Sequence, residues 1–72
     1  MTKEVFLALL TEEGLTTWEA EGIWTAQNKV SPDNVPHLTA TDVRGLGREM
    51  LPAMRRLRDL QRARGATHRP DL

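Results

Sequence analysis

The sequence predicts an all-α fold, a compact five-helix bundle with a longer C-terminal helix. Apolar residues recur at helical spacing near both ends of the chain, and threonines followed three positions later by an acidic residue stand where helices begin. No segment alternates apolar and polar residues well enough to predict a strand. The 72 residues, 39% hydrophobic and 28% charged, are typical of one soluble domain. We expect residues 1–64 to form this domain and residues 65–72 a flexible tail.

The first helix is predicted to run from about residue 3 to residue 13. Phe6, Leu7 and Leu10 recur at helical spacing and form one apolar face. Gly14 follows this face and is expected to end the helix, because glycine readily adopts the backbone conformations that follow a helix.

The second helix is predicted to open at Thr16, because Glu19 stands three residues later in capping-box spacing. It contains both tryptophans, Trp18 and Trp24, which we place in the core, with a protruding tryptophan at an interface as the alternative. Gly22 weakens this helix, so a hairpin that turns at residues 21–22 is the alternative.

The third element is predicted to be one short helical turn. Ser31 is suited to cap it, and Pro32 is suited to its first position. Val35 is expected to point inward. Pro36 prevents a longer helix here, because proline lacks the backbone N–H and restricts the residue before it.

The fourth helix is predicted over residues 39–46 and begins with a second capping box, formed by Thr39 and Asp42. Gly45 and Gly47 come next. We interpret them as a break in the chain, because glycine allows turns that are closed to other residues.

The last helix is predicted from about residue 50 to residue 64, with Pro52 in its first turn and Gly65 at its end. Its apolar residues recur at helical spacing and predict one buried face. These residues are Met50, Ala53, Met54, Leu57 and Leu60.

Charge divides the chain into two halves. Residues 1–42 contain seven acidic and two basic residues, a net charge of −5, and residues 43–72 contain eight arginines and three acidic residues, a net charge of +5. If folding keeps these charges on separate faces, one copy can attract another head to tail. The alternative is that both faces are simply solvated.

Several motifs together resemble the sterile alpha motif (SAM) domain. Residues 38–47, LTATDVRGLG, fill the family pattern L-T-x-x-D-[LV]-x-x-[LM]-G, and Val30 lies eight residues before its leucine, where the family has a buried aliphatic residue. Pro52 and Ala53 match the Pro-Ala of the polyhomeotic-like branch. Phe6 and Trp18 stand for the aromatic residues of the family's N-terminal motif. The resemblance covers about residues 5–60.

The resemblance implies a five-helix protein–protein interaction module, a scaffold or regulatory domain that binds copies of itself or related domains head to tail. An acidic surface from the middle of the chain would meet a basic surface at the start of the last helix. Carried over to this chain, the first surface comprises Asp33, Asn34, His37 and Asp42. The second comprises Gly47, Arg48, Met50, Leu51 and Arg55.

Nucleic-acid binding, above all of RNA, is the main alternative. Arg48, Arg55 and Arg62 recur every seven residues and predict a basic stripe along the last helix, able to contact phosphates. No aromatic residue interleaves with these arginines for base stacking, and the first half of the chain is acidic. A small docking domain with a helix-hairpin-helix fold is the other alternative.

The sequence contains no motif that predicts catalysis. It has no glycine-rich phosphate loop, no cysteine, and only two histidines, one of them in the predicted tail, so no metal or cofactor site is expected. Its longest apolar run, residues 5–10, is too short to span a membrane. We expect an intracellular, cytoplasmic protein with a protein partner and neither a membrane nor a small-molecule substrate.

Overall fold

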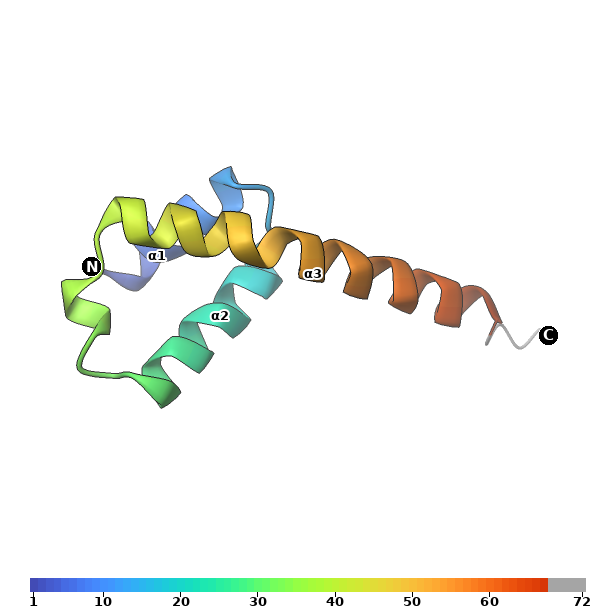
Figure 1. The fold of residues 1–72 in the computed structure, drawn as a ribbon. Coiled ribbons are helices and arrows are strands. Elements are labelled where there is room, and N and C mark those ends of the chain that lie inside the picture. The colour runs from blue at the N-terminus through green and yellow to red at the C-terminus, as the bar shows by residue number, and fades with distance from the viewer. Residues whose placement is uncertain (68–72) are drawn as a thin grey trace.

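The computed structural model describes residues 1–67, and the side chains of residues 1–64. This part of the chain forms three α-helices and one 3₁₀ helix (Figure 1). They are α1 (Lys3–Glu12), α2 (Thr17–Val30), η1 (Val35–His37) and α3 (Ala40–Thr67). No strand occurs among residues 1–67, so the all-α prediction is confirmed. The prediction of five helices is wrong, because the last two form one continuous helix.

Side-chain caps start the helices at the places that the sequence indicates. Thr16 and Glu19 form a full capping box at the start of α2, with the Thr16 hydroxyl accepting from the Glu19 N–H at 3.1 Å. Thr39 and Asp42 make the same reciprocal pair at the start of α3. The alternative hairpin does not form, because α2 passes through Gly22 without a turn.

Two local details differ from the prediction at the end of α2. Ser31 does not cap the next helix. It is the C-cap of α2, and its backbone N–H donates to the Gln27 carbonyl. Its own carbonyl accepts from the Asn34 N–H at 3.0 Å, which closes a turn over residues 31–34. The helical turn η1 follows, with Pro36 at an early helical position and Val35 buried as expected.

Gly14 ends α1 in a left-handed conformation, with φ of 108°. Glycine reaches this region without the steric cost that a Cβ brings. The reversal lets α2 begin at once and turn back along α1. A Cβ at Gly14 would also lie 3.4 Å from the side chain of Leu51 in α3, so three segments of the chain approach one another here.

The predicted glycine break between residues 45 and 47 does not exist, and α3 runs through it. Gly47 is needed for a close approach of helices, since a Cβ there would lie only 3.0 Å from Glu13 Cβ and 3.2 Å from Leu10. Contact between α3 and α1 therefore outweighs the low helix propensity of glycine. Pro52 lies inside α3 and not in a first turn.

The core lies where α1, the first half of α2 and the first half of α3 meet. Phe6, Leu10 and Val43 are the largest side chains that are fully buried. Trp24 packs edge-on against Phe6, with the ring centroids 5.1 Å apart, and joins the core as predicted. Trp18 and Val30 contradict the prediction, because they are 74% and 82% exposed. Trp18 lies two residues before buried Ala20, and therefore on the opposite side of α2.

The last part of α3, residues 55–67, extends beyond the other helices (Figure 1). We call it the outer half of α3. It makes the molecule elongated, with dimensions of 50 × 21 × 17 Å. Gly65 does not end the helix, which reaches Thr67. The remainder of the predicted tail, residues 68–72, lies outside the described residues. None of the helices in residues 1–67 combines the length and apolar character needed to cross a bilayer.

Candidate functional site

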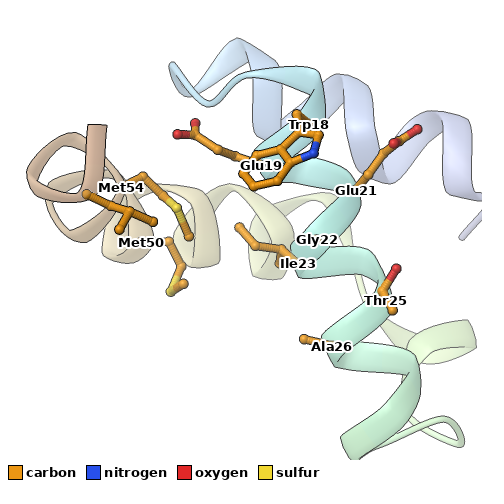
Figure 2. Close-up of a pocket in the computed structure, with 10 residues that line it drawn as sticks. Trp18, Glu19, Glu21, Gly22, Ile23, Thr25, Ala26, Met50 and Met54 are labelled. Carbon is orange, nitrogen blue, oxygen red and sulfur yellow. The ribbon is translucent and has the colours of Figure 1, made fainter. Parts of the chain in front are cut away.

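A groove opens between α2 and α3 (Figure 2). We call it the α2–α3 groove, and its volume is about 410 Å³. The α2 side presents Trp18, Gly22, Ile23 and Ala26, and the α3 side presents Met50, Met54 and Leu57. Glu19, Glu21 and Thr25 also line it from α2. Most of the lining is nevertheless apolar, so the groove offers a surface that water solvates poorly.

Small residues on α2 keep the groove open. Nothing lies within 4 Å of a Cβ built on Gly22, and Ala26 presents only a methyl group. In Figure 1, α2 also runs away from α3 after its first turns. Ile23 is buried at the base of the groove, where α2 and α3 are still close enough to cover it. The empty space therefore follows from both helix direction and side-chain size.

Large apolar side chains border the groove and continue past it. The Trp18 ring stands at the end of the groove nearest the start of α2 (Figure 2). On α3, Leu57 is 43% exposed and Leu60, one turn further along, is 65% exposed. Exposed apolar side chains that cluster in this way are typical of interaction surfaces, whereas scattered ones are ordinary.

An ion pair lies beside the groove, because Glu19 lines it and binds Arg58 of α3. Arg58 Nε donates to Glu19 Oε2 at 2.8 Å, and a terminal nitrogen of the same guanidinium donates to Glu19 Oε1 and, at 3.1 Å, to the Gly14 carbonyl. The hydrogen bond from Arg58 is the main reason why the pKa of Glu19 falls to about 2, although burial acts in the opposite direction. The pKa of Arg58 is raised by the same contact. Both groups stay charged at neutral pH and hold α3 against α2.

Two further ion pairs join α3 to the end of α1. Arg44 lies 3.3 Å from Glu12, and Arg48 lies 3.3 Å from Glu13. Together with the Glu19–Arg58 pair, they bring the acidic N-terminal part of the chain, residues 1–42, into contact with its basic C-terminal part. Folding therefore pairs some of the acidic residues of the first half with arginines of the second half. Negative and positive side chains do not lie on fully separate faces.

The residues predicted as binding residues are spread over several places. Asp33 and Asn34 lie exposed before η1, and His37 is exposed at its end. Asp42 is engaged in the capping box. The five predicted on the last helix lie along α3, but only Met50 lines the groove: Gly47 is buried, Arg48 pairs with Glu13, Leu51 packs near Gly14, and Arg55 is exposed.

Sequence reasoning missed the groove itself. The sequence predicts one buried face for Met54, Leu57 and Leu60 and favours the core for Trp18. The structure packs Met54 against the core but leaves Trp18, Leu57 and Leu60 exposed. The signal was present in the register of α2, since the capping box at Thr16 places Trp18 and Ala20 on opposite sides of the helix.

Comparison with known proteins supplies no relative. No protein-family model, no curated protein and no solved structure matches this chain. The similarity to the SAM domain therefore stays a prediction from sequence motifs.

Proposed function

We propose that this chain is a protein–protein interaction module that binds an amphipathic helix of a partner in the α2–α3 groove. The observation that carries the proposal is the exposed Trp18 beside a groove lined by Met50 and Met54. Tryptophan and other large apolar groups that are covered on binding supply most of the energy of protein interfaces. Methionine adapts its shape to the side chains that enter a groove.

The shape of the groove supports a helical occupant. Two helices form its walls, and their apolar residues recur at spacings of three and four along each wall. A third helix can place its own apolar stripe between them, as in other helix-in-groove complexes. The fixed charges of Glu19 and Arg58 beside the groove would orient that helix and contribute little affinity.

The SAM resemblance supports the same class of function. Head-to-tail association through the acidic mid-chain surface and the basic last-helix surface stays a prediction from that resemblance. Asp42 and Arg48 already have partners within the chain, since Asp42 caps α3 and Arg48 pairs with Glu13. We therefore expect the apolar groove to supply the affinity and the charged residues to steer the encounter.

Photo-crosslinking from the groove tests this function. A benzophenone amino acid replaces Ala26, which is exposed at the groove, or Ala8, which is exposed on α1 and does not line it. In the native host, illumination should give protein adducts from position 26 and few from position 8. Adding Trp18→Ala should reduce the position-26 adducts. Equal yields from both positions, or none from position 26, would refute the proposal.

RNA binding is a second candidate, favoured by the exposed arginines of the outer half of α3. Arg55, Arg56, Arg62 and Arg64 are all exposed there, on a helix that extends away from the core. Titration of a labelled RNA hairpin at several salt concentrations separates this candidate from the first. Binding that weakens steeply with salt and persists in the Trp18→Ala variant would favour RNA.

A further inference from the structure

We infer that the helix bound in the α2–α3 groove is the outer half of α3 from a second copy of this chain. The two copies would lie antiparallel about a two-fold axis near Leu57. This inference deepens the proposed function and rests on it, because it names the partner of the same groove.

The first support is that one apolar stripe runs from the groove onto the outer half of α3. Met50 and Met54 are partly buried in the groove, and Leu57 and Leu60 follow at the same helical spacing with rising exposure. At its inner end the stripe forms one wall of the groove, because α2 lies beside it there. It protrudes at its outer end, where the described side chains of residues 59–64 are all exposed.

A two-fold axis places the outer end of the apolar stripe of one copy against the inner end of the stripe of the other copy. An antiparallel second copy places its protruding Leu60 toward Met54 in the groove of the first copy, and the first copy does the same in return. Leu57 then faces Leu57. Such an isologous contact covers both stripes at once and closes on itself, so it gives a dimer and no filament.

Charge favours this occupant and this direction. Glu19 and Arg58 already pair within one chain. Outside this pair, residues 55–64 contain four arginines and one aspartate, whereas the α2 segment from Thr17 to Ala26 contains Glu21 and no basic residue. The antiparallel arrangement carries the basic outer half of one copy toward Glu21 on the α2 wall of the other. A parallel pair would instead place the arginines of both outer halves side by side, which their like charge opposes.

Oligomeric state gives the first test. Light scattering on the purified chain should show the mass rising from 8.1 kDa toward twice that value as concentration increases. Leu60→Glu should weaken dimerisation at least about tenfold, because it places a charge in the apolar contact. Lys3→Gln changes the net charge by the same amount, but Lys3 is exposed at the start of α1 and does not line the groove. This variant should dimerise like the parent.

Introduced cysteines test the direction of the pair, because the chain has none of its own. Ala53 and Gln61 lie four residues on either side of Leu57, and both are exposed. In an antiparallel dimer, an Ala53→Cys chain mixed with a Gln61→Cys chain should form mainly the mixed disulfide under mild oxidation. Mainly symmetric 53–53 and 61–61 products would overturn the antiparallel arrangement.

Self-pairing and the binding of any helix in the groove can be distinguished experimentally. A monomer at every concentration, with unchanged mass in Leu60→Glu, would overturn self-pairing. If crosslinks from position 26 then reach a different protein, the groove is an interaction site for a foreign helix and the proposed function stands. If position 26 gives no adduct at all, the proposed function fails as well. Circular dichroism of Leu60→Glu should match that of the parent, because Leu60 lies outside the core.

Discussion

Replacing Glu19 with Gln should separate the contribution of one charge from that of one helix cap. Glu19 accepts from the Thr16 N–H at 2.9 Å in the capping box and also binds Arg58. Glutamine has nearly the same shape and serves equally well at this position of a capping box. The variant therefore keeps the start of α2 and removes the negative charge that faces Arg58.

The pKa of Glu19 sets the size of the expected effect. Its fall from 4.5, the value of an unperturbed glutamate, to about 2 corresponds to about 3 kcal/mol of extra stability in the ionised form. The Arg58 side chain is 31% exposed, so solvent screens the pair. We expect Glu19→Gln to lower the free energy of unfolding by roughly 1–2 kcal/mol at pH 7. For a chain of this size, the melting temperature should fall by roughly 5–15 °C.

The same pKa fixes the pH dependence. A carboxyl group whose pKa is lower in the folded state stabilises the fold fully above its unfolded pKa, and this contribution disappears as pH falls toward the folded pKa. The difference in stability between the parent and Glu19→Gln should therefore be constant above about pH 4.5 and shrink between pH 4.5 and about pH 2. Urea unfolding followed by circular dichroism at a series of pH values measures this difference.

A matched control comes from Asp59, which pairs with Arg62 at 3.6 Å on the exposed surface of α3. Asp59→Asn removes one negative charge, as Glu19→Gln does, but it should change the free energy of unfolding by less than about 0.5 kcal/mol. The reasoning is refuted if the two variants are equally stable at pH 7, or if the Glu19→Gln deficit persists unchanged in acid.

Three other comparisons test the packing. Gly47→Ala should destabilise the fold by about 1 kcal/mol or more, because its Cβ would crowd α1. Gly45→Ala meets open space and should stabilise the fold by about 0.5–1 kcal/mol. If urea unfolding ranks the two variants the other way, the close contact at Gly47 is contradicted. Pro52→Ala restores a backbone N–H inside α3 and should raise stability by about 1–3 kcal/mol, with slower amide exchange around it, and no gain would count against a continuous helix. Trp18→Ala should change the free energy of unfolding by no more than about 0.5 kcal/mol at monomeric concentrations, whereas Trp24→Ala should lower it by about 3 kcal/mol. Equal losses of stability in thermal unfolding would refute the placement of Trp18 at the surface and Trp24 in the core.

The features that could be predicted from the sequence are those that short stretches of chain decide. Thr16 with Glu19 and Thr39 with Asp42 start helices through contacts three residues apart, and Gly14 ends α1 through its own φ angle. These contacts need no knowledge of the tertiary fold. The same is true of the apolar face of α1, whose Phe6 and Leu10 are fully buried.

The features that could not be predicted depend on which helices meet. Gly47 appears as a helix breaker in the sequence, and only its closeness to Glu13 shows why the helix continues through it. The partners Glu19 and Arg58 are 39 residues apart. Nothing local indicates that these two charges join. Trp18 was placed in the core on residue type alone, although the register set by Thr16 puts it on the far side of α2 from Ala20.

Pro52 weakens the hydrogen bonding of α3 locally, so the helix bends more easily at this point. An ordinary residue at this position would donate its backbone N–H to the carbonyl four residues earlier, and proline leaves that carbonyl without its helical donor. The weakened turn separates the portion of α3 held by α1 from the portion that bears Leu57 and Leu60. The far portion is itself held to α2 through Arg58 and Glu19, so a small bend at Pro52 changes the angle between the segment packed on α1 and the segment bound to α2.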